Sequence, residues 1–123
     1  MGNIAMIAAG GALGALLRYA VSGALQRSSA FMLPLGTIAV NLTGSLLIGL
    51  LWGLMEETTV SAGLKGFIFI GMLGAFTTFS AFALENLHLL RASQYSLVFV
   101  NIAVSNIAGI ALAFAGYKAG RLI

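Results

Sequence analysis

Polar and aromatic residues that could contact an ion lie inside the apolar segments of this chain. Between Gly71 and Phe82, two glycines, two adjacent threonines, a serine and three phenylalanines occur within an uncharged run from Gly66 to Leu84. Glycine and paired β-branched threonine disfavour regular helix, and a backbone carbonyl freed in hydrocarbon needs a partner or a cavity. The sequence therefore predicts a break in this helix, between about Ala75 and Thr78, and the break is expected to be a site for an ion.

The aromatic residues of this stretch offer a way to hold a small anion. Phe76, Phe79 and Phe82 recur at every third position and are expected on one face of the helix, beside Thr78 and Ser80. An aromatic ring has a negative face and a positive edge, so its edge can face a small anion while excluding water. The alternative is ordinary aromatic bulk that packs against other helices or faces lipid.

Polar residues in two other apolar segments could reach the same depth. Asn41 lies within the second segment, and Ser105 and Asn106 lie in the middle of the last one. A buried amide offers two donors and an acceptor, which all need partners in hydrocarbon. Hydrogen bonding between helices is one explanation for Asn41, but polar residues from three segments near half depth favour an ion pathway.

Membrane-spanning helices must position these residues. The chain has 123 residues, of which 60% are hydrophobic and 7% are charged, and a soluble domain of this size cannot bury so much apolar surface. A span needs about 20 mostly apolar residues. Four stretches qualify: Ile4–Leu25, Leu35–Met55, Gly66–Leu90 and Tyr95–Tyr117. The short links between them predict an all-α membrane protein that forms a single domain across residues 1–123.

Glycine pairs spaced four residues apart occur in three of these segments. The pairs are Gly10 and Gly14, Gly49 and Gly53, and Gly116 and Gly120. Such spacing lets helix backbones approach closely in lipid. Together, the pairs predict tight helix packing and a dimer.

Basic residues are balanced between the two ends of the expected bundle. They are Lys65, Lys118 and Arg121 at the end that holds the amino terminus, Arg27 and Arg91 at the other, and Arg18 inside the first segment. Membrane orientation follows the asymmetry of Lys and Arg. The chain therefore either has a modest preference that these counts do not reveal, or inserts in both orientations.

The remaining titratable residues argue against catalysis. Glu85 and His88 follow Phe82 at helical spacing and could pair on one face, or could extend to the headgroups as Arg18 could. Arg18 could also raise the anion concentration at the mouth of a vestibule. The polar set gives no arrangement of nucleophile, base and orienting group, so an enzyme is not expected. The scattered basic residues also form no surface for nucleic acid.

Three motifs follow one another along the first three segments. They are Gly10-Gly11-x-x-Gly14-x-x-x-Arg18-Tyr19, Gly36-Thr37-x-x-x-Asn41-x-x-Gly44 and Gly71-x-x-Gly74-x-x-Thr77-Thr78-Phe79-Ser80-x-Phe82. Together they resemble the Fluc (CrcB) family of fluoride channels. The third motif is the most specific, and the length and four-span layout fit the family over the whole chain.

This resemblance implies a dual-topology dimer of two antiparallel four-helix subunits in the cell membrane, with two fluoride pathways and a sodium ion on the two-fold axis. Backbone carbonyls of Gly74 and Thr77 from both subunits would hold the sodium. Asn41 would donate its amide to fluoride, and Phe79 and Phe82 would present ring edges along the pore. The other positions that match the family's pathway are Arg18 at the vestibule, and Thr78, Ser80, Glu85 and Ser105 along a polar track.

The chain departs from the family at two positions on that track. Ala81 stands where the family often has Thr, and Gly109 where it frequently has Ser. The implied function is passive fluoride export, which would confer fluoride resistance. Two alternatives stay open: a proton-coupled exporter of the small multidrug type, for which the first segment lacks a carboxylate, and a non-conducting subunit that pairs with a paralogue.

Overall fold

Four helical stretches of this chain are long and apolar enough to cross a membrane. The computed structural model describes residues 2–27 and 32–123, which contain helices and turns but no strand. The four stretches are Gly2–Arg27, Leu35–Met55, Ala62–Arg91 and Tyr95–Leu122. Each overlaps an expected segment, but the third begins at Ala62 rather than Gly66 and the fourth ends at Leu122 rather than Tyr117. The link at residues 28–31 lies outside the described residues. The chain is thus an all-helical, multi-pass membrane protein.

The first two spans are single helices, whereas the other two are composite. The first is α1 (Gly2–Arg27) and the second is α2 (Leu35–Met55). The third consists of α3 (Ala62–Lys65), η1 (Gly66–Leu73), α4 (Gly74–Phe76) and α5 (Phe79–Arg91). The fourth consists of α6 (Tyr95–Ala103), η2 (Val104–Ala108) and α7 (Gly109–Leu122). The segments η1 and η2 are π-helical, a wider winding that is frequent at functional sites.

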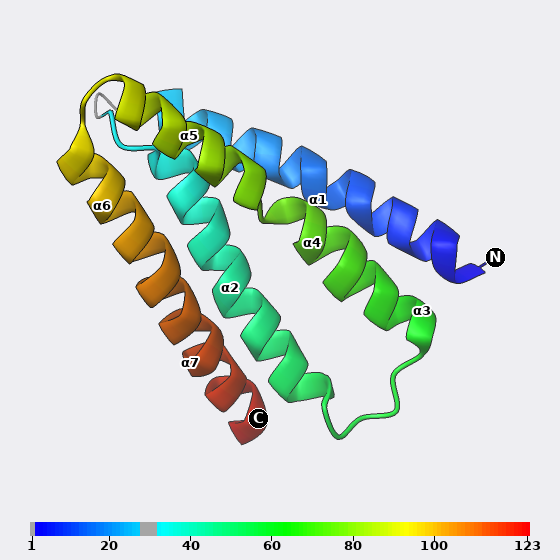
Figure 1. The fold of residues 1–123 in the computed structure, drawn as a ribbon. Coiled ribbons are helices and arrows are strands. Elements are labelled where there is room, and N and C mark those ends of the chain that lie inside the picture. Colours follow the sequence, from blue (N-terminus) through cyan, green and yellow to red (C-terminus); the bar gives the residue numbers. More distant parts are fainter. Residues whose placement is uncertain (1, 28–31) are drawn as a thin grey trace.

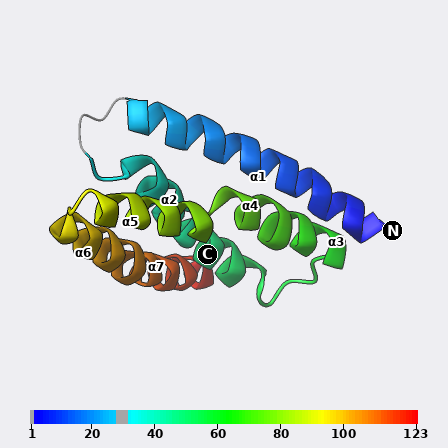
Figure 2. The same ribbon diagram turned by 45° about the horizontal axis from the view of Figure 1, so that its top comes forward.

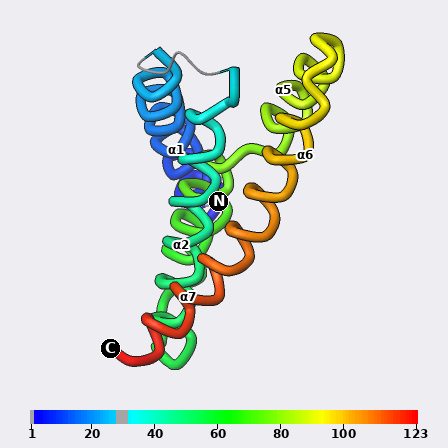
Figure 3. Tube along the Cα trace, turned by 90° about the vertical axis from the view of Figure 1, so that its left-hand side faces the viewer, coloured from blue at the N-terminus to red at the C-terminus, as the bar shows by residue number. Residues whose placement is uncertain are grey.

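The spans alternate in direction and pack in two pairs. Figures 1 and 2 show α1 beside α3 and α4, and α2 beside α7. The residues of α5 contact α6, and in Figure 3 these two helices diverge from the neighbouring ends of α1 and α2. The middle of the third span, between α4 and α5, therefore lies where α5 and α6 separate from the rest of the bundle.

Glycine backbones make the close contacts inside each pair. A Cβ atom added at Gly10 would lie 2.3 Å from the carbonyl oxygen of Phe67, and one added at Gly49 would lie 2.0 Å from that of Ala113. The other members of the predicted pairs also face neighbouring backbone: Gly14, Gly53, Gly116 and Gly120. The predicted tight packing is confirmed. Because all these contacts are made within one chain, the glycine pairs carry no information about a dimer.

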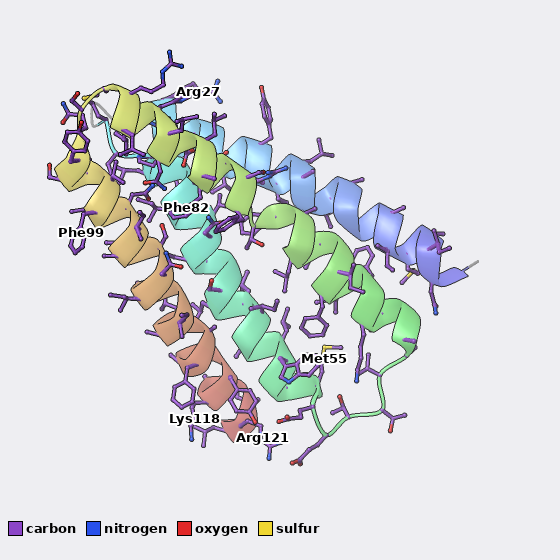
Figure 4. The ribbon with its side chains drawn as sticks, in the orientation of Figure 1. Arg27, Met55, Phe82, Phe99, Lys118 and Arg121 are labelled. Carbon is purple, nitrogen blue, oxygen red and sulfur yellow. The ribbon has the colours of Figure 1, made fainter. Side chains whose placement is uncertain are left out.

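The bundle has few buried apolar side chains and a broadly apolar exterior. Among residues 2–27 and 32–123, the buried ones are Ile38, Val40, Leu73, Phe76 and Leu89. Large side chains such as Phe99, which is 74% exposed, project outward from the helices (Figure 4). An apolar exterior is what contact with lipid requires, because hydrocarbon solvates apolar surface.

Several charged residues lie at the two ends of the bundle. Figure 4 shows Lys118 and Arg121 at one end and Arg27 at the opposite end. Arg121 Nη1 lies 2.6 Å from Glu57 Oε1 and 3.3 Å from Glu56 Oε2. These contacts tie the end of α7 to the segment that follows α2.

Candidate ion site

Two residues near the middle of the third span have extended backbone. Thr77 has φ −79° and ψ 155°, and Thr78 has φ −149° and ψ 119°. The helix α4 ends just before them and α5 begins just after. The Thr78 Oγ1 accepts a hydrogen bond from the Ala81 N–H at 3.2 Å and so caps α5. Backbone groups of extended residues at membrane depth need such polar partners.

Asn41 on α2 supplies partners for both backbone groups of Thr78. The Thr78 N–H donates to Asn41 Oδ1 at 2.8 Å, and Asn41 Nδ2 donates to the Thr78 carbonyl oxygen at 3.1 Å. Hydrogen bonding between segments, the alternative role considered for Asn41, is therefore present. The amide has two donor hydrogens, and among the described residues only one of them has an acceptor. The other is available to a ligand.

Two backbone carbonyls lack the N–H donors that they would have in a regular α-helix. In an α-helix, a carbonyl accepts from the N–H four residues later. For Gly74 that donor would be the Thr78 N–H, which bonds to Asn41 instead. For Thr77 it would be the Ala81 N–H, which bonds to the Thr78 hydroxyl. Carbonyl oxygens of this kind are ligands for hard cations, so the two predicted sodium ligands fit that ion in chemistry.

A cavity of about 320 Å³ lies beside this segment. Residues of three spans line it: Asn41, Gly44, Ser45 and Ile48 from the second, Leu73, Thr77, Thr78, Phe79 and Phe82 from the third, and Ser105 and Asn106 from the fourth. The chain thus gathers amide donors, hydroxyls and aromatic rings around one hollow in the membrane-spanning part of the bundle.

Two of the three phenylalanines adjoin this cavity, and the third does not. The ring centroids of Phe79 and Phe82 are 5.5 Å apart with an interplanar angle of 42°, and Figure 4 shows Phe82 at mid-length of the bundle. Phe79 is 78% exposed, whereas Phe76 is buried at 8%. The expectation that all three share a face is wrong for Phe76, because the extended residues Thr77 and Thr78 interrupt the helical repeat.

A second hollow of about 310 Å³ adjoins the first at Thr78, and Arg18 and Glu85 both line it. The Thr37 hydroxyl donates a short hydrogen bond to Glu85 Oε1. The other carboxylate oxygen, Oε2, is buried and has no partner among the described residues. Glu85 therefore bonds across to α2 rather than to His88, the partner considered from the helical spacing.

The remaining predicted residues carry hydroxyls: Ser105 lines the cavity, and Ser80 does not. Ser80 is exposed, and its Oγ lies 3.3 Å from Thr78 Oγ1. Ser105 bonds to Asn101, a residue that sequence analysis did not consider, and Asn101 in turn bonds to Asn86. The signal that could have revealed this pair is a polar residue one turn before Ser105, on the same face of the fourth span.

The two departures from the family pattern have different surroundings. Ala81 is half-buried and lines the hollow that contains Arg18 and Glu85. A Cβ added at Gly109 would lie 3.6 Å from Ser45 Oγ and 3.9 Å from Leu42 Cδ2, which is ordinary contact. Packing therefore does not demand glycine at position 109, and the nearby hydroxyl belongs to Ser45.

Known proteins resemble this chain over nearly its full length. The chain matches the family model described as "CrcB-like protein, Camphor Resistance (CrcB)" over residues 5–117. Three similar proteins are each named "Fluoride-specific ion channel FluC". The protein of Parabacteroides distasonis is 39% identical over 98% of this chain and 94% of its own length. That of Maridesulfovibrio salexigens is 43% identical over 95% and 94%, and that of Magnetococcus marinus is 42% identical over 98% and 99%.

These names describe transport and not catalysis. The family match includes the second and third spans, most of the first and fourth, and every residue of the cavity described above. The protein therefore belongs to the CrcB family.

Proposed function

We propose that this chain is a fluoride-selective channel that lets fluoride leave the cell passively across the cell membrane. The observation that carries this proposal is the free N–H of Asn41 in a cavity that Phe79 and Phe82 also line. Relatives at 39% and 43% identity are named fluoride-specific channels, which supports the choice of ion.

The cavity offers groups that can replace part of an anion's hydration shell. The second amide hydrogen of Asn41 is a donor, and the edges of the Phe79 and Phe82 rings are positive. The Thr78 hydroxyl belongs to this polar surface and lies 3.3 Å from that of Ser80. Thr78 also connects the cavity to the hollow that holds Arg18 and Glu85. Arg18 would attract anions to that hollow. Larger halides should pass poorly, because the pathway is proposed to be narrow as well as poor in donors.

Sodium is proposed as a structural ion at the carbonyls of Gly74 and Thr77. These two oxygens have lost their helical donors to Asn41 and to the Thr78 hydroxyl. When bound, the ion would supply a fixed positive charge that offsets the cost of bringing an anion into a region of low dielectric. The extended residues Thr77 and Thr78 would then serve both ions, because this segment exposes carbonyls to the cation and shapes the cavity for the anion.

The proposed partner is a second copy of the chain in the opposite orientation. Polar and aromatic groups in or beside the cavity are exposed, among them Phe79, Ser80 and Asn106. Exposed polar groups at this depth are costly in hydrocarbon, so another protein surface should cover them. The even distribution of Lys and Arg between the two ends supports insertion in both orientations.

Fluoride efflux from liposomes tests this function and separates it from the alternatives. The purified chain is reconstituted alone into vesicles loaded with potassium fluoride, and efflux is followed with a fluoride electrode. A passive channel releases fluoride when valinomycin lets potassium leave, and the rate does not depend on a pH gradient. Efflux driven by a pH gradient without valinomycin would indicate a proton-coupled exporter. Efflux that requires a paralogue would indicate a non-conducting subunit.

A further inference from the structure

A chain of three hydrogen bonds begins and ends at residues that line the cavity. Ser105 Oγ lies 3.3 Å from Asn101 Oδ1, and Asn101 Nδ2 lies 3.2 Å from Asn86 Oδ1. Asn86 Nδ2 lies 2.8 Å from the carbonyl oxygen of Phe82. Asn101 is 0% exposed and Asn86 is 8% exposed, whereas Ser105 and Phe82 line the cavity. The two amides therefore act behind the cavity surface and not on it.

The carbonyl of Phe82 fixes the direction of every bond in this chain. A carbonyl oxygen only accepts, so Asn86 must turn its NH₂ group toward Phe82 and its oxygen toward Asn101. Asn101 must then turn its NH₂ group toward Asn86 and its oxygen toward Ser105. An amide oxygen also only accepts, so the Ser105 hydroxyl has to be the donor. A hydroxyl has one hydrogen, and here it points away from the cavity.

This direction matters for an anion in the cavity. The side of Ser105 Oγ that faces the cavity presents lone pairs, which repel an anion. For Ser105 to donate to the anion, its hydrogen must leave Asn101 Oδ1. That oxygen belongs to a fully buried residue, and a buried acceptor without a partner is costly. Asn101 and the anion therefore compete for one hydrogen.

We propose that Asn101, held in place by Asn86, is a positioning residue that keeps the Ser105 hydroxyl from donating to the anion and so weakens anion binding. The inference rests on the proposed function, because it concerns the same cavity. Weak binding favours conduction, since an ion that enters a pathway must also leave it. Asn101 would therefore set how tightly the channel holds fluoride without touching the ion.

A double-mutant cycle tests this role through the fluoride concentration that gives half-maximal efflux. In the wild-type background, Ser105→Ala should not raise this concentration, because the hydroxyl does not donate to the anion. Asn101→Leu should lower it by about tenfold, because the freed hydroxyl donates to a charged acceptor. Ser105→Ala in the Asn101→Leu background should remove that gain.

A second variant covers the possibility of poor folding. Asn101→Leu leaves the buried Oδ1 of Asn86 without its donor, which can impair folding. The combined change Asn86→Leu and Asn101→Leu removes both amides, which is nearly neutral when the shapes are kept. It also frees the Ser105 hydroxyl, so the same tenfold gain and the same loss with Ser105→Ala are expected.

The outcomes are separable. If the wild-type chain conducts fluoride but Ser105→Ala has the same effect in all backgrounds, Asn101 has only a structural role and this inference is overturned, while the proposed function stands. If the wild-type chain conducts no fluoride, the proposed function is overturned and the inference with it.

Discussion

Replacing Asn41 by aspartate converts a side-chain amide into a carboxylate at the centre of the proposed pathway. The new carboxylate could still accept from the Thr78 N–H, which lies 2.8 Å from the present amide oxygen. It could not donate to the Thr78 carbonyl, and two oxygens would face each other where Nδ2 and the carbonyl oxygen are now 3.1 Å apart. The substitution also places a negative charge where the anion is proposed to bind.

The charge is the larger effect. Two like charges about 4 Å apart repel by about 4 kcal/mol at an effective dielectric constant of about 20. A barrier higher by that amount slows a process by about three orders of magnitude. We therefore expect Asn41→Asp to reduce fluoride efflux from liposomes about 1,000-fold.

A matched control separates charge at the site from the substitution itself. Asn3→Asp makes the same change in the first turn of α1, far along the chain from the cavity and at a helix end that favours negative charge. Its efflux should stay within about twofold of wild type. Size-exclusion chromatography should show both variants folded. Efflux by folded Asn41→Asp within about tenfold of wild type would refute the role given to Asn41.

Three further predictions concern the scaffold and the proposed cation. Gly49→Ala should lower the unfolding free energy by about 2 kcal/mol, because its Cβ would lie 2.0 Å from a backbone oxygen of α7. The control Gly11→Ala, whose Cβ meets no atom within 4 Å, should be neutral or stabilising. Equal losses of stability in thermal unfolding would contradict this packing. Thr78→Val keeps the shape but removes the cap of α5, so it should cost about 1 kcal/mol and reduce efflux; an unchanged melting temperature would argue against the cap. Replacing all sodium by N-methylglucamine should lower the melting temperature of the detergent-solubilised protein; no difference would count against sodium at Gly74 and Thr77.

The spans could be read from the sequence because a membrane helix is defined by its apolar length. Two boundaries differed most: the third span begins at Ala62 rather than Gly66, and the fourth ends at Leu122 rather than Tyr117. Lys65 made the apolar run appear to begin at Gly66, but Ser61 accepts a hydrogen bond from the Leu64 N–H at 3.3 Å and caps a helix that begins at Ala62. Ser61 is a plausible N-cap by residue type, and the structure confirms it. The cap begins the helix before the charged Lys65, whereas apolar length defines only the part within the membrane.

The contacts of the site were less predictable than its members. Composition placed Asn41, Thr78 and Ser105 at similar depth, but the bonding of Asn41 to both backbone groups of Thr78 joins residues 37 positions apart and depends on how α2 packs. The position of Phe76 was wrong because a helical period cannot be extended across residues that are not helical. Asn101 was overlooked because its importance comes from a partner on another helix.

The glycine pairs show what spacing can and cannot establish. Their four-residue repeat correctly indicated close helix contact, but the partner of each glycine is set by the order and direction of the spans. In this chain, Gly10 and Gly49 pack against helices of the same subunit. The surface that would meet a second copy is instead the exposed side of the cavity, where polar residues and Phe79 lie.

The central claim is that donors and ring edges around Asn41 select fluoride. Its most direct test compares fluoride and chloride efflux from liposomes that contain only the purified chain, under the same valinomycin-mediated potassium flux. Fluoride efflux well above that of empty vesicles, with chloride efflux at the background rate, is the predicted result. Equal efflux of both halides, or no fluoride efflux from a folded and reconstituted protein, would contradict it.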